Sequence, residues 1–357
     1  MEKKNRILVI VISVFFLTMS LWAICGEKPE YSESERRVLA KFPEFEMENI
    51  LNGKFAKGFD EYTVDRFPTR DSLRSVKAYV KTTLFGQKDN NQIYTCGKHI
   101  SKMEYPMNTA MLDYAAELFA NIKDTYLQDN NIYLAIIPDK NRYLAEESGH
   151  LHMDYDAFSK YLSERMEYAK YVEIADLLEA DDYYFTDTHW RQEKIVDVAE
   201  RIADAMDVKL SADYEQKKIE NPFYGVYVGQ SALKWEPDTI LYLENEMTKA
   251  AVVEGAKGIY DKSKATGKDP YEMFLSGNQP IVSIKNKENT SGKKLIMFRD
   301  SFGSSIAPLF IEAYSEIILV DLRYIPSSML EEEIDFNNAD VLFLYNTLIL
   351  NNSRSMK

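Results

Sequence analysis

The chain contains a continuous apolar run at residues 132–138, which directly follows a predicted amphipathic helix. Asn108 is placed to cap that helix, and its apolar side chains recur at helical spacing. The apolar side chains of the helix are Met111, Leu112, Ala115, Leu118, Phe119, Ile122 and Tyr126. A continuous apolar run after a helix is typical of a strand buried on both faces of a parallel sheet. The run therefore restricts the fold to one in which helices cover a central sheet.

The same succession of strands and helices returns along the chain. Further strands are predicted at residues 171–174, 294–298, 317–320 and 341–345, and further helices at 156–170, 195–206, 304–314 and 329–334. This alternation predicts an α/β fold with a mostly parallel sheet and helices on both faces. Functional sites of such sheets collect at the carboxyl ends of strands. Ser301 and Asn346 both fall at such ends.

Two other parts of the chain depart from this alternation. Residues 207–290 carry shorter apolar runs, several glycines and charged turns, which predict an insertion or peripheral lobe within a domain spanning residues 91–350. Residues 27–90 predict a polar stalk followed by helices. A turn is expected at residues 65–71, because Pro68 disfavours helix at the residue before it. The charged residues expected to form a local ion-pair cluster at this turn are Asp65, Arg66, Arg70 and Asp71.

The first residues indicate a membrane anchor. Lys3, Lys4 and Arg6 precede an uncharged stretch at residues 7–25, and a membrane-spanning helix needs roughly 20 apolar residues. The stretch lacks the small-residue exit of a cleaved signal peptide. Positive charge before it and acidic residues after it predict a cytoplasmic N-terminus. Residues 1–26 are therefore expected to form a cytoplasmic tail and a single-pass anchor in the cell membrane, with the following domain extracytoplasmic.

The overall charge excludes some classes of partner. The 357 residues carry a formal net charge of -14, whereas nucleic-acid binders concentrate lysine and arginine. No nucleic-acid partner is therefore expected, and the acidity also disfavours docking on anionic lipid. The chain has two cysteines, Cys25 and Cys96, so no disulfide framework is expected to support the fold.

The residues that could carry chemistry begin with Asp187 and His189. An aspartate this close to a histidine can accept a hydrogen bond from one imidazole nitrogen and leave the other free as a base. The candidate that such a base would serve is Ser301, which follows a predicted strand and opens a predicted helix. At such an elbow the serine hydroxyl points out of the sheet, and the following backbone N–H groups converge where an oxyanion could form. Taken alone, however, Ser301 and Asp187 also fit the ordinary use of such side chains as helix caps.

A metal site is the second hypothesis for the same region. His150 and His152, together with Asp187 and His189, would supply three imidazoles and a carboxylate, which is a plausible zinc set. However, His150 and His152 lie in a polar loop and show no helical ligand spacing. No metal is therefore expected. His99, in a predicted turn, is expected to be exposed.

The stretch Thr-Asp-Thr-His-Trp at residues 186–190, with Arg-Asp-Ser-Phe following at residues 299–302, resembles the DHHW protein family. That family is related to the SGNH-hydrolase-like domains of periplasmic alginate O-acetylation proteins. Further matching stretches lie at residues 34–40, 65–70, 137–140, 274–278 and 320–324. Thr188 stands where the family motif has a second histidine, which argues against a role that needs two adjacent histidines. The resemblance spans nearly the whole chain and implies an SGNH-hydrolase-like, flavodoxin-like sheet domain.

The resemblance also implies a role for each candidate residue. In the related domains the aspartate and histidine precede the serine, as they do here. Ser301 would then be the nucleophile, His189 the general base and Asp187 its orienting partner, and the Ser301 and Phe302 backbone N–H groups would bind the oxyanion. The additional residues that the resemblance suggests as hydrogen-bond donors or substrate contacts are Asn346, Tyr324 and Asn278.

The function implied by the resemblance is an extracytoplasmic O-acyltransferase. It would take an acetyl or similar acyl group on Ser301, supplied by a membrane-bound acyltransferase, and pass it to a hydroxyl of a cell-surface or exported polysaccharide. The acyl-enzyme divides the transfer into two easier steps, and no cofactor is expected. An SGNH-type carbohydrate esterase, with water as acceptor, would use the same residues. The alternative from another class is a non-catalytic glycan-binding scaffold of an export complex, whose tryptophans and tyrosines would stack on sugars.

Overall fold

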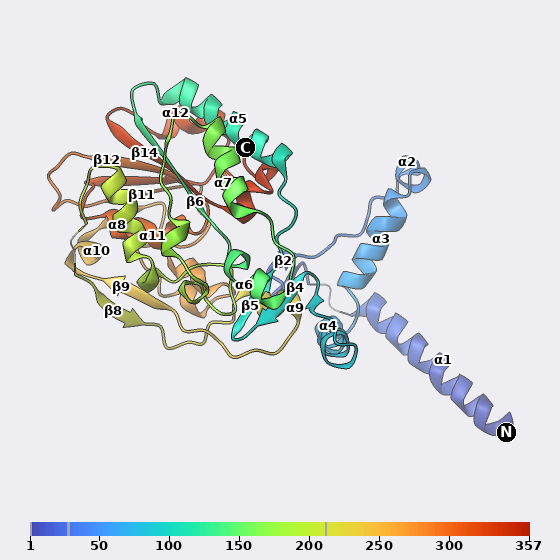
Figure 1. Ribbon diagram of the computed structural model, residues 1–357. Coiled ribbons are helices and arrows are strands. Elements are labelled where there is room, and N and C mark those ends of the chain that lie inside the picture. The colour runs from blue at the N-terminus through green and yellow to red at the C-terminus, as the bar shows by residue number, and fades with distance from the viewer. Residues whose placement is uncertain (1, 27–28, 211–212) are drawn as a thin grey trace. The chain divides into compact units, whose positions relative to one another are not determined.

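The structure is a computed structural model that describes residues 2–26, 29–210 and 213–357 (Figure 1). Residue 1 of the predicted tail, residues 27–28 of the predicted stalk and residues 211–212 of the predicted insertion lie outside these ranges. The chain divides into two compact units. The N-terminal unit comprises Met1–Asn91 and Val228–Lys234, and the sheet unit comprises Gln92–Tyr227 and Trp235–Lys357.

The N-terminal unit consists mainly of helices. Its elements in chain order are α1 (Glu2–Cys25), β1 (Tyr31–Ser32), β2 (Arg37–Val38), α2 (Met47–Leu51), α3 (Lys54–Asp65), α4 (Arg70–Tyr79), a π-helical turn (Val80–Leu84) and β3 (Asp89–Asn90). The predicted break between two helices is confirmed, because α3 ends and α4 begins on either side of Pro68. Within α1, Lys3–Cys25 is long and apolar enough to cross a membrane, and a signal sequence would have the same features.

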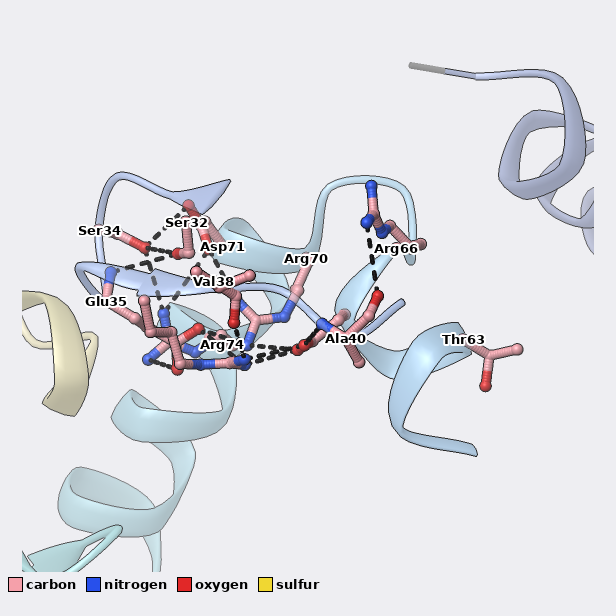
Figure 2. Close-up of polar contacts among 12 residues, drawn as sticks. Ser32, Ser34, Glu35, Val38, Ala40, Thr63, Arg66, Arg70, Asp71 and Arg74 are labelled. Carbon is pink, nitrogen blue, oxygen red and sulfur yellow. Dashed lines mark hydrogen bonds and ion pairs between the residues drawn. The ribbon is translucent and has the colours of Figure 1, made fainter. Parts of the chain in front are cut away.

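The charged residues predicted to form a local ion-pair cluster at the turn between α3 and α4 also contact residues outside this turn. The Asp65 carboxylate accepts hydrogen bonds from Arg37, with Nη2 at 2.5 Å, and from the Ala40 backbone N–H at 2.9 Å. Arg70 lies 3.3 Å from the same carboxylate. The hydrogen bond from Arg37 lowers the pKa of Asp65 to about 2. The turn is thereby joined to residues 34–40, a relationship that Figure 2 shows.

The sheet unit is built on the mostly parallel sheet that the sequence predicts. Its seven strands follow the order β10-β11-β13-β12-β14-β6-β7. The strand bounds are β6 (Asn131–Ile137), β7 (Lys170–Tyr171), β10 (Val252–Glu254), β11 (Ile281–Lys285), β12 (Lys294–Arg299), β13 (Glu316–Val320) and β14 (Ala339–Asn346). Neighbours from β13 to β7 run parallel, whereas β11 and β10 are added antiparallel at the other edge.

Helices cover both faces of this sheet (Figure 1). Alternate residues of β6 enter different cores: Ala135 and Ile137 pack with α8 (Val196–Ala205), whereas Leu134 and Ile136 pack with α5 (Thr109–Tyr126) and α7 (Tyr155–Arg165). Full burial of such aliphatic side chains contributes about 1.5–3 kcal/mol each. The burial of both strand faces explains why the sequence of β6 is apolar throughout.

The segment predicted as an insertion at residues 207–290 is only partly peripheral. Its strands β10 and β11 extend the central sheet, whereas residues before β10 and between β10 and β11, among them Phe223 and Phe274, form a separate small core with Tyr184. The helix predicted at residues 304–314 is shorter in the structure than in the prediction. The α-helix α11 covers only Gly303–Ile306, and a 3-10 turn follows at Ala307–Phe310. The remaining elements are β4 (Ile93–Cys96), β5 (His99–Lys102), α6 (Asn141–Ser148), β8 (Glu215–Lys218), α9 (Val226–Ser231), β9 (Leu241–Glu244), α10 (Glu246–Ala250), α12 (Leu330–Glu333) and α13 (Thr347–Leu350).

Candidate active site

Ser301 stands in the tight connection between β12 and α11, at the carboxyl end of a central strand. The preceding residue, Asp300, is fully buried, and its carboxylate accepts the Phe302 backbone N–H at 2.9 Å and the Asn346 backbone N–H at 2.7 Å. These bonds tie the turn to the end of the neighbouring strand β14. Burial raises the pKa of Asp300. The buried Asp300 carboxylate therefore fixes the backbone on either side of the turn that carries Ser301, while Ser301 itself is partly exposed.

A second segment, residues 183–190, carries the aspartate and the histidine. It folds back on itself, with a bridge between Tyr183 and Trp190. The Trp190 indole Nε1–H donates to the Ser305 hydroxyl at 2.9 Å and to the Phe302 carbonyl at 3.2 Å, and both acceptors belong to the segment that follows the nucleophile candidate. Trp190 is therefore a packing residue that fastens this segment to α11.

The structure brings Asp187, His189 and Ser301 together. The Nδ1 atom of His189 lies 2.6 Å from Oδ1 of Asp187, and its Nε2 lies 2.7 Å from the Ser301 Oγ. With the Nδ1 proton facing the carboxylate, Nε2 is the acceptor for the serine hydroxyl. The second carboxylate oxygen of Asp187 accepts the Val226 backbone N–H at 2.8 Å. Asp187 is fully buried and His189 is 8% exposed, so little of the base is open to solvent.

Tyr271 holds the imidazole of His189 from its face. The two rings stack with centroids 3.7 Å apart and planes 11° apart. The Tyr271 hydroxyl donates to the Ser305 hydroxyl at 2.8 Å, so the tyrosine ring is itself fixed. Tyr271 lies in the predicted insertion, and nothing in the sequence pattern marked it as part of the site.

Lys140 and Asp238, for which the sequence predicts no role, hold the backbone just before Asp187. The Lys140 ammonium donates to the carbonyls of Tyr184 at 2.9 Å and Phe185 at 3.1 Å, and burial lowers the pKa of Lys140 to about 7. The Asp238 carboxylate accepts the backbone N–H groups of Phe185 and Thr186, each at 2.8 Å. Lys140 is the last residue of the stretch 137–140, which matches the family pattern. This match is the feature of the sequence that could have pointed to Lys140 as part of the site.

The Phe302 backbone N–H and the Asn346 side chain both hydrogen-bond to groups within the protein. The Phe302 backbone N–H is directed at the Asp300 carboxylate. Asn346 is fully buried; its amide Nδ2 donates to the Ile137 carbonyl at 3.1 Å, and its Oδ1 accepts the Leu348 N–H at 2.9 Å. Asn346 therefore caps α13 and joins β14 to β6. The proposed oxyanion or substrate role of both residues stays a prediction.

Tyr324 and Asn278 lie away from these contacts. Tyr324 is 46% exposed, and its ring faces the Arg323 guanidinium at 5.4 Å. Asn278 is exposed and follows a turn with positive φ at Leu275, Ser276 and Gly277. Among the described residues, no hydrogen bond or ring contact joins either side chain to the aspartate, histidine or serine. Their substrate roles also stay predictions.

The other histidines make separate contacts. No cluster of three or more histidine, cysteine, aspartate or glutamate side chains that could hold a metal ion occurs within residues 2–26, 29–210 and 213–357. His150 stacks on Tyr94 with ring centroids 3.8 Å apart. The expectation that His99 is exposed was wrong: it is 6% exposed, because Phe185 packs against its ring and Asp181 lies 2.9 Å from its Nε2.

No protein-family model and no curated protein sequence matches the chain. Among solved structures, a DHHW family protein from Eubacterium siraeum aligns with a TM-score of 0.59 and 20% identity over 74% of this chain and 92% of its own. PatB1 of Bacillus cereus, solved with a sulfonyl adduct, aligns with a TM-score of 0.56 and 17% identity over 72% of this chain and 95% of its own. The O-acetyltransferase domain of Pseudomonas putida AlgJ aligns less well, with a TM-score of 0.42 and 14% identity over 68% of this chain and 84% of its own. The similarity to the DHHW family is thus confirmed at the level of the fold.

Proposed function

We propose that this chain is an acyl-transfer enzyme in which Ser301 is the nucleophile, His189 the general base and Asp187 the residue that orients it. The observation that carries the proposal is the unbroken hydrogen-bonded connection from Asp187 through His189 to Ser301, with heavy-atom distances of 2.6 and 2.7 Å. Distances of 2.6–3.2 Å between nucleophile and base are those that proton transfer requires. A non-catalytic scaffold has no need for this geometry.

The chemistry would proceed in two steps. As the Ser301 oxygen attacks the acyl carbonyl, His189 Nε2 takes the hydroxyl proton and then gives it to the leaving group, which leaves an acyl-serine. In the second step His189 deprotonates the acceptor hydroxyl, which attacks the acyl-serine, and His189 returns the proton to the Ser301 oxygen as the bond between that oxygen and the acyl group breaks. Asp187 stabilises the imidazolium in both steps. The Ser301 backbone N–H, which has no hydrogen-bond partner among the described residues, is the open donor for the oxyanion.

We further propose that the acyl group is acetyl or a similar small group and that the acceptor is a hydroxyl of a cell-surface or exported polysaccharide. The chain would be held by α1 in the cell membrane with its sheet unit outside, and a membrane-bound acyltransferase would supply the acyl group. The apolar length of Lys3–Cys25 supports the anchor, and the fold shared with the DHHW family protein supports the motif-based resemblance on which this substrate class rests.

The test is covalent labelling of the detergent-solubilised full chain with a sulfonyl fluoride and, separately, with an activated acetyl ester. Because PatB1 has been solved with a sulfonyl adduct, the first reagent suits a protein of this fold. Mass spectrometry should find both groups on the peptide that contains Ser301. Ser301→Ala should abolish labelling, whereas Ser304→Ala, a change of another serine in α11, should retain it. Ester hydrolysis that continues unchanged in Ser301→Ala would overturn the proposal.

A carbohydrate esterase is the second candidate, because the partly exposed Ser301 leaves water able to reach an acyl-serine. The two activities are separated by the fate of the acetyl group. Addition of oligosaccharides should speed the loss of acetyl from Ser301 and yield an acetylated sugar if transfer is the reaction. Release as free acetate at a rate independent of the oligosaccharide would assign an esterase instead.

A further inference from the structure

Arg299, the last residue of β12, carries a fully buried positive charge two positions before the proposed nucleophile. Its Nη1 donates to the Asp300 carbonyl oxygen at 3.3 Å and lies 3.5 Å from Oδ2 of Asp321. Its Nε and Nη2 have no hydrogen-bond partner among the residues that the structure describes. Arginine stays charged when buried, and a buried charge with incomplete partners is often no more stable than an apolar side chain of similar volume. Stability therefore does not account for a charge at this position.

The stem of the Arg299 side chain lies against the turn that contains Ser301. A Cβ atom added to Gly303, the first residue of α11, would lie 2.6 Å from the Cβ and 2.8 Å from the Cγ of Arg299. The absence of a side chain at Gly303 thus leaves the space that this stem occupies. The guanidinium is thereby directed along the turn, where it reaches the Asp300 carbonyl.

The end of the neighbouring strand β13 holds the guanidinium of Arg299 in place. Asp321 directly follows β13 and is fully buried. Arg323 donates to both oxygens of this carboxylate, from Nε to Oδ1 at 2.9 Å and from Nη2 to Oδ2 at 2.6 Å. The Asp321 carboxylate is therefore fixed where it faces Arg299. It also keeps a charged partner if Arg299 is replaced by an apolar residue.

The Asp300 carbonyl belongs to the same peptide group as the Ser301 N–H. The carbonyl and N–H of a planar trans peptide point in opposite directions, so a donor that fixes the carbonyl also fixes the direction of the N–H. Two donors hold this carbonyl: Arg299 Nη1 and, at 3.1 Å, the Gly303 N–H. Linked hydrogen bonds polarise one another, so the charged donor also makes the Ser301 N–H a stronger donor.

We propose that Arg299 is a positioning residue for the oxyanion site, which orients and polarises the Ser301 N–H through the Asp300 carbonyl; this inference rests on the proposed function. When the Ser301 oxygen attacks the acyl carbonyl, negative charge develops on the carbonyl oxygen of the acyl group. The Ser301 N–H is the open donor for that oxygen, and a donor fixed before the reaction stabilises the charge without reorganisation. Arg299 itself does not touch the acyl group.

The experiment compares Arg299→Met with Arg201→Met in the full chain solubilised in detergent. Arg201 of α8 makes the same kinds of contact, since it donates to the Glu173 carbonyl at 3.1 Å and pairs with Asp176 at 3.2 Å. Its side chain is 40% exposed, and none of its described contacts involves the turn that carries Ser301. Thermal unfolding of each variant shows whether it is folded.

Two acyl donors separate an effect on the oxyanion from an effect on the nucleophile or the base. One is an activated acetyl ester, and the other is its thionoacetyl analogue, in which sulfur replaces the carbonyl oxygen. Sulfur is a weak hydrogen-bond acceptor, so the charge that develops on it gains little from the Ser301 N–H. Mass spectrometry measures the rate at which each donor acylates Ser301.

Arg299→Met should slow acylation by the acetyl ester roughly ten- to hundredfold, less than the full loss of an oxyanion donor, because the Gly303 N–H still holds the carbonyl. Acylation by the thionoacetyl ester should hardly change. Arg201→Met should match the wild type with both donors. A folded Arg299→Met in which both esters slow equally, or neither slows, would overturn the inference.

Arg299→Lys serves if Arg299→Met does not fold, because it keeps a charge facing Asp321. The lysine ammonium ends one bond short of the Arg299 Nη1 position and recovers the bond to the Asp300 carbonyl only in part. The acetyl ester should therefore again slow more than the thionoacetyl ester, although less than in Arg299→Met. Equal slowing of the two esters in this variant would count against the role of Arg299 in the same way.

Failure of the proposed function has a different signature. If neither ester acylates Ser301 in the wild-type chain, the acyl-transfer proposal fails and the role of Arg299 fails with it. If the wild-type chain is acylated and the two esters respond equally to Arg299→Met, the proposed function stands and only the role of Arg299 is lost.

Discussion

Tyr271 stacks face to face on His189, with ring centroids 3.7 Å apart, and the two residues come from segments separated by the whole of α8, β8, α9, β9, α10 and β10. The stacking restricts rotation of the imidazole about its own side-chain bonds. Since His189 must face Asp187 with one nitrogen and Ser301 with the other, the ring orientation decides whether the connection exists. Tyr271 is therefore expected to affect the rate of the reaction more than the stability of the fold.

Replacement of Tyr271 separates the effects of the ring and the hydroxyl. Tyr271→Phe keeps the stacked ring and removes only the hydrogen bond to Ser305, so labelling of Ser301 should fall less than about tenfold. Tyr271→Leu removes the flat surface on which His189 rests, and labelling should fall roughly hundredfold. The measurement is the second-order labelling rate at fixed pH. Equal rates in the two variants would show that the stacked ring has no role.

Asp187→Asn should place a hydrogen-bond donor, the NH2 group of the asparagine, opposite His189 Nδ1. With the amide oxygen at the Oδ2 position, where it accepts the Val226 N–H, the NH2 group faces His189 Nδ1 and also the His189 backbone N–H, which Oδ1 of Asp187 accepts at 3.1 Å. This arrangement favours the tautomer with the proton on Nε2, which cannot accept the Ser301 proton. The labelling rate should fall by roughly 10³- to 10⁴-fold.

The control for this prediction is Asp181→Asn, which changes the aspartate that faces His99 at the surface. It should leave the labelling rate unchanged. Retention of the wild-type rate in Asp187→Asn would mean that the carboxylate does not set the tautomer of His189.

Lys140 should make the stability of the protein depend on pH. Burial lowers its pKa from 10.5 to about 7, so between these values the unfolded chain holds more protons than the folded one. The free energy of unfolding should therefore rise with pH from about 7 to 10.5 relative to Lys140→Met, and the penalty for burying the charged ammonium is complete once pH has fallen to about 7. Denaturant unfolding of both proteins at pH 7, 8 and 9 measures this difference.

Lys140→Met also removes the donor of the Tyr184 carbonyl, at a cost of about 1–3 kcal/mol. The cost of the lost hydrogen bond does not depend on pH. It can therefore be separated from the change of the free energy of unfolding with pH that the titration of Lys140 causes. A difference between wild type and variant that is constant from pH 7 to 9 would show that Lys140 does not titrate in this range.

Gly225→Ala should disturb the segment that carries Asp187. The added Cβ would lie 2.3 Å from the Thr186 carbonyl carbon and 2.4 Å from the Asp187 nitrogen, and backbone atoms cannot move aside as a flexible side chain can. We expect a loss of about 1–3 kcal/mol in the free energy of unfolding and a reduced labelling rate. Gly58→Ala, where the nearest atom is a side-chain carbon of Pro43 at 3.0 Å, is the matched control. It should keep both properties, since alanine is the better helix former.

Local features of the sequence predicted much of the fold. The cap at Asn108, the apolar face of α5 and the continuous apolar run of β6 each depend on a few neighbouring residues, and all three predictions are confirmed. Residues 207–290 were harder to assign, because β10 and β11 are short and join the sheet only through pairing with a distant strand. Periodicity cannot show which strand a segment will pair with.

The sequence predicted Asp187, His189 and Ser301 as candidates for acyl-transfer chemistry, from their types, their places beside predicted elements and the resemblance of their order to that of the related domains. Only the tertiary structure decided that His189 and Ser301, 112 residues apart, lie 2.7 Å from each other. It also decided that Tyr271 and Val226 complete the surroundings of the pair. Contacts of this kind depend on how whole elements pack, and packing is set by side chains that are distant in sequence and carry no local pattern.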